Sequence, residues 1–368
     1  MLRTLEIVDL KIPFKLNFKH NAAERKETQS VIAIAADGTY KGYGEGCPRE
    51  YVTNESLATA NIFFSKIKSA IVEEIGNLES LLLFKNKNER SVEQNPAAWC
   101  AIEIALLDLF AKQKGCSIEK LLNRNELSGE FQYTAVIGDG SVKYFGEIVE
   151  QHLQLGFHDF KIKVSGNAVI DYEKIVVLKS LCPTCTLRLD ANNVWENHVD
   201  VVRYINGLPC EIKGLEEPLQ DKNIDSLIAL SKEISTPIIL DESFKSFGDL
   251  EKTVKHKEAF IVNLRVSKMG GILNSLRIAD FCLQEEMSVI VGAQVGETSI
   301  LTRAALCVAS ALKPKYVGLE GAYGTFLLEK DIVEKPLMFG EGGILKPDQF
   351  LDREVNGLQL KFSQYPEI

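Results

Sequence analysis

The chain has 368 residues, 45% of them hydrophobic and 25% charged, which is typical of a soluble globular protein with about two domains. Its formal net charge of −9 and its lack of a basic run argue against a nucleic-acid partner. No stretch reads as a membrane span, and the charges scattered near the N-terminus are unlike a signal peptide. The eight scattered cysteines are typical of reduced thiols, so we expect a cytoplasmic protein.

The first part of the chain, residues 1–125, predicts an α+β domain. Alternating apolar residues from 5 to 13 predict a strand, and Asp37-Gly38 between two apolar runs predicts a hairpin. The polar segment from His20 to Thr28 predicts a loop. Antiparallel strands followed by helices are typical of an α+β unit. The expected helices, from the spacing of apolar residues, cover 54–74 and 97–114.

After Gly129 short apolar strands alternate with amphipathic helices, which predicts a parallel α/β barrel over residues 126–324. An open doubly wound sheet is the alternative, although no GxGxxG follows a first strand. The remaining residues, 325–368, are rich in loops, and we expect them to run back over the first domain. The expected strands cover 131–136, 157–164, 187–190, 212–216, 237–241, 260–264, 288–292 and 316–320.

Acidic residues recur at the ends of the predicted barrel strands. Asp190, Glu216 and Asp241 end three successive strands, and the active sites of parallel barrels lie at that end. Each acid alone is more simply explained as a helix N-cap or a loop ion pair, but their recurrence weakens that explanation. Three hard oxygen ligands suit Mg²⁺. The pattern therefore predicts a magnesium site at the barrel mouth.

Lysines occupy other strand ends of the same predicted barrel. Lys161 and Lys163 share one face of the second strand, where their mutual repulsion would lower the pKa of one of them toward the range of a general base. Lys268 follows the sixth strand, roughly opposite the second in a circle of eight. Lysines on two sides of a bound substrate could take a proton from one face and return it to the other.

These motifs, taken in order, resemble the enolase superfamily, and the lysine pattern resembles its muconate-lactonising subgroup and the dipeptide epimerases within it. The motifs are Lys-x-Lys, Asp-Ala-Asn, Glu-Glu-Pro, Asp-Glu-Ser and Lys-Met-Gly-Gly. The resemblance covers essentially the whole chain and implies a modified TIM barrel with an N-terminal capping domain completed by the C-terminal segment. It also implies Mg²⁺-assisted abstraction of a proton α to a carboxylate.

The resemblance assigns a role to each motif residue. Lys163 and Lys268 would be the two acid/base residues, while Lys161 would stabilise the enolate charge. Thr134, at the end of the first barrel strand, would lie near the substrate carboxylate, and Glu297 would also contact the substrate. The residues that would hold Mg²⁺ are Asp190, Glu216 and Asp241.

Two positions depart from the dipeptide epimerase pattern. Gly318-Leu319-Glu320 stands where these enzymes carry the Asp-x-Asp that holds the substrate ammonium, which leaves Glu320 for that role. Ala23 stands where epimerases of alanyl-glutamate carry an arginine, with Arg25 close by. A glutamate side chain is therefore disfavoured, and a small or apolar one is favoured.

The sequence thus predicts Mg²⁺-dependent epimerisation of a dipeptide, Ala-X with small or hydrophobic X, by an enzyme that could form homo-oligomers. Several reactions could use the same site: N-acyl amino acid racemisation, o-succinylbenzoate synthesis and muconate cycloisomerisation. A non-catalytic barrel that only binds metal and ligand is a further alternative, but paired lysines argue against it, because binding alone needs no proton carriers.

Overall fold

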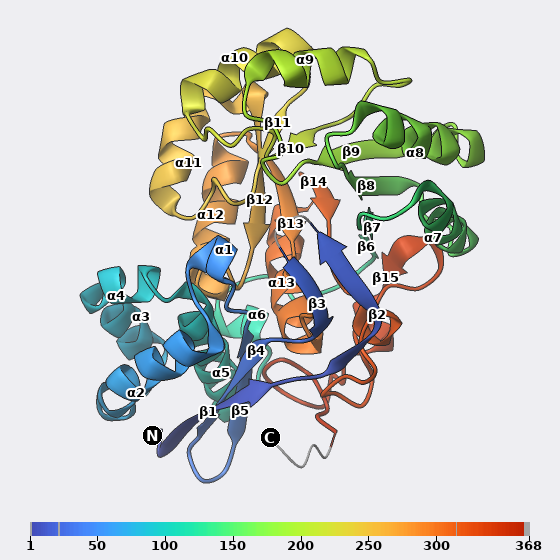
Figure 1. Ribbon diagram of the computed structural model, residues 1–368. Helices are drawn as coiled ribbons and strands as arrows, with labels where there is room; N and C mark the ends of the chain where they lie inside the picture. The colour runs from blue at the N-terminus through green and yellow to red at the C-terminus, as the bar shows by residue number, and fades with distance from the viewer. Residues whose placement is uncertain (1, 21–22, 314, 364–368) are drawn as a thin grey trace.

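The computed structural model describes residues 2–20, 23–313 and 315–363, and its largest unit is a curled sheet of eight parallel strands (Figure 1). The strands follow one another in chain order, and the backbone amide of Thr134 donates to Leu319 O at 2.8 Å, which brings the two edges of the sheet together. This arrangement confirms the predicted barrel and excludes the open doubly wound sheet. The strands are β7 (Ala135–Ile137), β8 (Asp159–Lys163), β9 (Thr186–Asp190), β10 (Leu215–Glu216), β11 (Ile238–Leu240), β12 (Phe260–Arg265), β13 (Ser288–Gly292) and β14 (Tyr316–Leu319).

Helices between the strands surround the barrel on its outside (Figure 1). Most begin at a serine, threonine or asparagine whose side chain accepts a hydrogen bond from the first turn, as Ser141 and Asn223 do. Their buried faces cover the outward-pointing apolar side chains of the strands. The barrel helices are α7 (Val142–Gln154), α8 (Ala168–Leu181), α9 (His198–Asn206), α10 (Ile224–Ile234), α11 (Phe247–Thr253), α12 (Ile272–Gln284) and α13 (Ser299–Leu312), with the 3-10 turn η1 (Val254–Ala259) before β12.

The N-terminal part packs an antiparallel sheet against a buried helix. Strands β1 (Thr4–Leu10), β4 (Ser30–Ala36) and β5 (Lys41–Gly46) form the sheet, which lies on α5 (Pro96–Gln113). A Cβ atom at Gly44 would lie 2.0 Å from Ala101 O, so only glycine lets this strand approach the helix so closely. The other helices here are α1 (Glu50–Thr53), α2 (Leu57–Glu74), α3 (Leu78–Lys87), α4 (Glu89–Glu93) and α6 (Ile118–Leu121).

The segment that was expected to be a loop forms a hairpin instead. Strands β2 (Pro13–His20) and β3 (Ala23–Glu27) pair with each other, so the prediction of a loop from 20 to 28 was wrong for most of that segment. The polar composition misled because a two-stranded ribbon satisfies its backbone through its own pairing and needs no apolar face. The amide of Lys15 also donates to Leu327 O at 2.8 Å, which ties the hairpin to the segment after β14.

The C-terminal segment returns to the capping part of the chain. Strand β15 (Ile344–Leu345) pairs with β6 (Phe131–Gln132), and the amide of Leu358 donates to the buried carboxylate of Asp108 at 2.8 Å. We propose that the chain divides into three parts, residues 1–125, 126–324 and 325–368. The short 3-10 turns η2 (Gly324–Phe326), η3 (Glu341–Gly343) and η4 (Pro347–Gln349) lie in this segment. In the described part of the chain, no helix has both the length and the hydrophobicity that a membrane-spanning segment needs.

Glu45 joins the capping part to the barrel through a fully buried carboxyl group. It accepts hydrogen bonds from the amide and hydroxyl of Thr298 at the start of α13, at 3.1 and 2.7 Å. Burial raises the pKa of Glu45 to about 7, although the bonds from Thr298 oppose the rise. A carboxyl group whose pKa is raised on folding stabilises the fold below its unfolded pKa, and that stability is lost as the pH rises through about 7.

We therefore expect Glu45→Gln to flatten the pH dependence of stability. Between pH 5 and pH 8 the free energy of unfolding should fall by about 2–3 kcal/mol less in the variant than in the parent chain, from a pKa shift of roughly two units at about 1.4 kcal/mol each. Urea unfolding at a series of pH values measures this. Parallel curves for the two proteins would contradict the role given to Glu45.

Candidate active site

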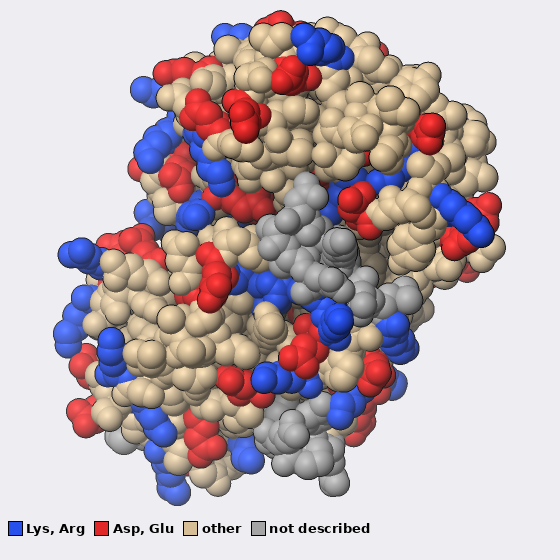
Figure 2. All heavy atoms as spheres, viewed as in Figure 1, with Lys and Arg blue, Asp and Glu red and all other residues tan. Residues whose placement is uncertain are grey.

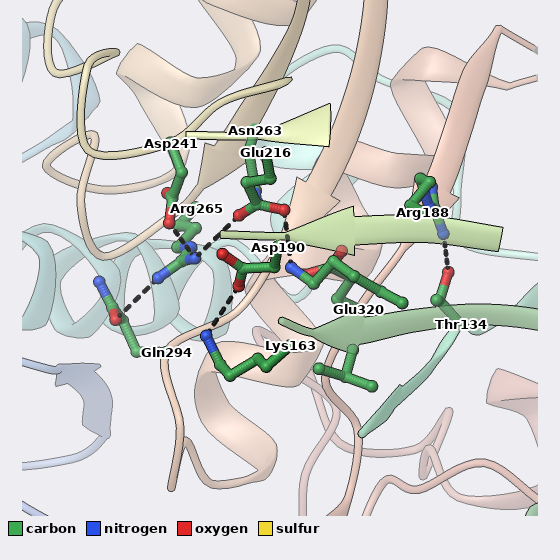
Figure 3. A network of polar contacts seen from close by, with 12 residues as sticks. Thr134, Lys163, Arg188, Asp190, Glu216, Asp241, Asn263, Arg265, Gln294 and Glu320 are labelled. Carbon is green, nitrogen blue, oxygen red and sulfur yellow. Dashed lines mark hydrogen bonds and ion pairs between the residues drawn. The ribbon is translucent and has the colours of Figure 1, made fainter. Parts of the chain in front are cut away.

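Four successive barrel strands deliver ionisable side chains to one end of the barrel (Figure 3). Lys163 ends β8, Asp190 ends β9 and Glu216 ends β10, and the three are neighbours in strand register. Asp241 directly follows β11. The predicted convergence of these residues thus occurs, because parallel strands in register end at the same level.

Each of the three carboxylates is buried and paired with a cation. Lys163 Nζ lies 2.7 Å from Asp190 Oδ2, and Lys161 Nζ lies 2.9 Å from Glu216 Oε2. Asp241 is paired with Lys268 at 2.9 Å and also with Arg265. Such pairing is required, because an unpaired charge at this depth costs several kcal/mol.

Burial and the charges of neighbouring side chains set the pKa values of the cluster. Burial raises the pKa of Glu216 to about 8, with Asp190 adding to the rise and Lys161 opposing it. Burial by itself would raise the pKa of Asp241 as well, but Arg265 and Lys268 lower it to about 2. At Lys161 burial lowers the pKa, but Glu216 and Glu320 raise it more. Lys161 is therefore not the lysine whose pKa is lowered.

A cavity of about 190 Å³ opens above this cluster. Barrel residues supply its charged wall, and the segment after β14 supplies apolar side chains. In the space-filling view, acidic and basic side chains gather where the barrel part meets the capping part (Figure 2). The charged residues that line it are Asp139, Lys161, Lys163, Asp190, Glu242, Arg265, Glu297 and Glu320, and the apolar and aromatic ones include Tyr51, Ile148, Tyr323, Phe326, Leu327 and Leu328.

Among the lining residues, Glu320 and Glu297 lie where the substrate was expected. Glu320 Oε2 accepts from Lys161 Nζ at 2.7 Å, while its Oε1 is buried without a hydrogen-bond partner. Burial raises the pKa of Glu297 to about 8, and the amide of Gln294 donates to its Oε1 at 2.6 Å. Glu320 therefore lines the cavity and keeps one carboxylate oxygen without a hydrogen-bond partner.

Two predicted substrate contacts lie elsewhere. Thr134 precedes β7 instead of ending it, and its hydroxyl bonds to Asp159 and Arg188 at the other end of the barrel (Figure 3). Arg25 is buried and donates to Gln29 Oε1 at 2.5 Å. It lies over the ring of Tyr51, which lines the cavity, but is not itself among the described lining residues. The side chain at position 23 lies outside the described ones. The expected strand from 131 to 136 divides into β6 (Phe131–Gln132) and β7 (Ala135–Ile137), so Thr134 lies between them, at the beginning of the barrel strand.

Lys268 does not reach the cavity in this structure. Its Nζ donates to Asp241 O at 2.7 Å, Asp241 Oδ1 at 2.9 Å and Asn263 O at 2.9 Å, so all three N–H groups are occupied. Only 2% of the residue is exposed. The lysine predicted to face Lys163 therefore points into the protein, and its acid/base role stays a prediction.

Arg265 faces the cavity instead, and the sequence analysis missed it. It ends β12 on the same face as Asn263, and its guanidinium donates to Gln294 Oε1 at 3.2 Å and to Asp241 (Figure 3). Burial lowers the pKa of Arg265, but Asp241 and Glu216 raise it more. The period of two along the strand could have identified this residue, because Asn263 and Arg265 alternate with buried apolar side chains.

The donor set at the strand ends fits Mg²⁺. Asp190, Glu216 and Asp241 are hard oxygen donors from adjacent strands. Burial raises the pKa of Glu216 and repulsion from Asp190 adds to the rise, so a divalent cation would stabilise the charged carboxylates. As they stand, no three His, Cys, Asp or Glu side chains within 2–20, 23–313 and 315–363 are arranged to hold a metal ion, since lysines and Arg265 are paired with the carboxylates.

Comparison with known protein families assigns the chain to a class. Residues 145–350 match the model described as enolase C-terminal domain-like, and residues 3–123 match the N-terminal domain of mandelate racemase / muconate lactonizing enzyme. The chain belongs to the enolase superfamily, which confirms the resemblance noted in the sequence. Members of this superfamily generally use Mg²⁺.

Several individual relatives within the superfamily are epimerases. The L-Ala-D/L-Glu epimerase of Clostridium acetobutylicum is 25% identical over 95% of this chain and 97% of its own length. The hydrophobic dipeptide epimerase of Enterococcus faecalis is 27% identical over 77% and 79%. The fold matches the Cytophaga hutchinsonii dipeptide epimerase solved with Mg and D-Ala-L-Val, with a TM-score of 0.86, 23% identity and coverage of 100% and 97%.

Other relatives are named N-succinyl-L-Arg/Lys racemase and o-succinylbenzoate synthase. Because the relatives are epimerases, racemases and synthases, the chain is an enzyme, and its class is that of the isomerases. The alternative of a non-catalytic barrel is set aside. The names of these relatives support epimerase activity, but they differ in substrate and so do not identify the substrate of this chain.

We expect Mg²⁺ to stabilise the folded protein through these carboxylates. At a Mg²⁺ concentration of about 100 times Kd, the gain is about 2.7 kcal/mol and the melting temperature rises accordingly. Asp241→Asn should remove the Mg²⁺-dependent part of this rise. Asp225→Asn, an equivalent change on the exposed surface of α10, is the control and should keep it. A melting temperature that responds equally to Mg²⁺ in both variants would contradict the assignment.

Proposed function

We propose that the enzyme catalyses Mg²⁺-dependent epimerisation of a dipeptide, Ala-X with small or hydrophobic X, by 1,1-proton transfer at the α-carbon of the C-terminal residue. The observation that carries the proposal is the ammonium group of Lys163, which lines the cavity beside the predicted metal ligand Asp190. Similarity to dipeptide epimerases over most of the chain supports the substrate class.

Lys163 is positioned to take the α-proton. Its Nζ is held by Asp190 Oδ2 at 2.7 Å and Asn192 Oδ1 at 2.5 Å, and the side chain remains 10% exposed toward the cavity. Asp190, Glu216 and Asp241 would hold Mg²⁺, whose chemistry when bound is stabilisation of the negative charge that develops on the substrate carboxylate. Lys161 adds a fixed positive charge on the same wall.

Glu320 provides the site for the α-ammonium of a dipeptide. Its Oε1 is buried, unpaired and part of a residue that lines the cavity, so an incoming ammonium would satisfy an acceptor that is otherwise left without a partner. The departure from Asp-x-Asp has a structural reason, since a Cβ atom at Gly318 would lie 2.0 Å from the guanidinium of Arg188.

The apolar wall favours a hydrophobic side chain at the C-terminal residue. Phe326, Leu327, Leu328 and Ile148 line the cavity, whereas Arg25 does not. A carboxylate among these side chains would be desolvated without a partner, at a cost of several kcal/mol. The geometry therefore supports Ala-Val or a similar dipeptide over Ala-Glu.

A second candidate is elimination of a β-substituent, as the name o-succinylbenzoate synthase of some relatives suggests. The favouring observation is that Lys268 points away from the cavity and leaves Lys163 beside it. An elimination needs only one proton carrier, because the group that takes the α-proton can return it to the leaving group.

Lys163→Ala should abolish exchange of the α-proton with solvent, with a loss of roughly 10²–10⁴-fold, the usual contribution of a general base. Proton NMR of the dipeptide in D₂O measures the exchange. Lys232→Ala, at an exposed position of α10, is the control. Exchange at the parent rate in Lys163→Ala would sink the proposal.

The substrate class is tested by comparing Ala-Val, acetyl-Ala-Val and Ala-Glu under one set of conditions. We expect Ala-Val to have the highest kcat/KM and acetylation to lower it by at least about tenfold, because Glu320 would lose its cationic partner. Glu320→Gln should abolish this discrimination. A preference for Ala-Glu would assign the distal carboxylate to a cation such as Arg25, and a preference for the acetylated compound would indicate an N-acyl amino acid racemase.

A further inference from the structure

Arg265 lies across the barrel mouth from Lys163. Strands β8 and β12, which these residues end, are separated by β9, β10 and β11 in the sheet of eight, so their ends stand on opposite sides of the barrel. Both side chains line the cavity. A substrate held between them would have the ammonium of Lys163 on one face of its α-carbon and the guanidinium of Arg265 on the other.

The guanidinium of Arg265 is fixed in place. Asp241 pairs with it, Glu216 Oε1 lies 3.8 Å away, and Gln294 accepts from it at 3.2 Å. Lys268, three residues later, is turned away, and the cavity it lines is a separate one that also includes Val52 and Thr53. The cationic group opposite Lys163 is therefore an arginine.

We propose that Arg265 sets the stereochemical course of the reaction by confining fast proton transfer to the substrate face that Lys163 meets. The inference rests on the proposed function, in which Lys163 forms the enolate. An arginine side chain gives up its proton far less readily than a lysine, so transfer at the second face, which completes the epimerisation, becomes the slow step.

The consequence is a large difference between exchange and inversion. Inversion requires one carrier to give a proton while the other takes one, so the two carriers must have similar proton affinities. The ordinary values of lysine and arginine differ by about two units or more, which corresponds to a rate penalty on the order of 100-fold for inversion. Exchange by Lys163 alone carries no such penalty, because the same nitrogen removes and returns the proton.

The test follows both processes in one experiment. Each epimer of Ala-Val, and of acetyl-valine and succinyl-lysine as N-acylated alternatives, is incubated with the Mg²⁺-loaded enzyme in D₂O, and NMR and chiral chromatography report deuterium uptake and inversion. We expect one epimer to exchange with retention about 100-fold faster than it inverts, and the other epimer to exchange slowly. Equal rates of exchange and inversion in the parent enzyme would overturn the inference.

Arg265→Lys supplies a second carrier of matched affinity. It should lower the ratio of exchange to inversion from about 100 to within about tenfold, with thermal unfolding as the check on folding. Arg203→Lys, at an exposed position of α9, is the matched control and should leave the ratio unchanged. If Arg265 had a purely structural role, Arg265→Lys would change the rates of exchange and inversion by the same factor. An unchanged ratio of exchange to inversion in a folded Arg265→Lys variant would therefore overturn the inference.

Failure of the proposed function has a different signature. Exchange with the N-acylated compounds but not with Ala-Val would contradict the dipeptide class while leaving the ratio, and hence the inference, measurable. Absence of exchange with every compound would contradict enolate formation by Lys163, and the inference would fall with it.

Discussion

The structure depends on compensating buried charge at the mouth of the barrel. Three carboxylates end adjacent strands with 2% or less of each residue exposed, in a region where water cannot screen them. Lys161, Lys163 and Lys268 approach them from neighbouring elements within 3 Å. Removing Lys161 or Lys163 would weaken the compensation of the carboxylate that it contacts, so the strand ends are constrained electrostatically as well as by packing.

The same compensation makes the site ready for a metal ion. Cations of the chain hold the carboxylates close together against their repulsion, and a divalent ion could take over part of that role. Glu216 shows the balance most clearly, because burial raises its pKa to about 8 while Lys161 opposes the rise. The three carboxylates therefore pair with cations of the chain here and could instead coordinate Mg²⁺.

Differences from the dipeptide epimerase pattern arise inside an otherwise shared framework. A side chain at Gly318 would have to displace the guanidinium of Arg188, which Asp159 holds in place. Arg265, at the end of β12, lines the cavity, whereas the ammonium of Lys268 is hydrogen-bonded to Asp241 and Asn263. One barrel can thus keep the carboxylates at its strand ends while other side chains around its mouth change.

The sequence by itself determined the barrel and the acids at its strand ends. Both follow from local rules: hydrophobic periodicity marks the strands and helices, and parallel strands in register bring their last residues to one edge, as with Lys163, Asp190 and Glu216. Strand β3 was not predicted, because its sequence Ala23–Glu27 carries no apolar alternation.

Only the tertiary structure decided which of the remaining side chains face the cavity. The orientation of a residue beyond a strand end depends on the path of the turn and on partners from other strands. Lys268 therefore turned inward to Asp241 and Asn263, and Thr134 fell at the opposite end of the barrel beside Arg188. Spacing along one strand cannot reveal such pairings, because the electrostatic energy that selects them comes from residues distant in sequence.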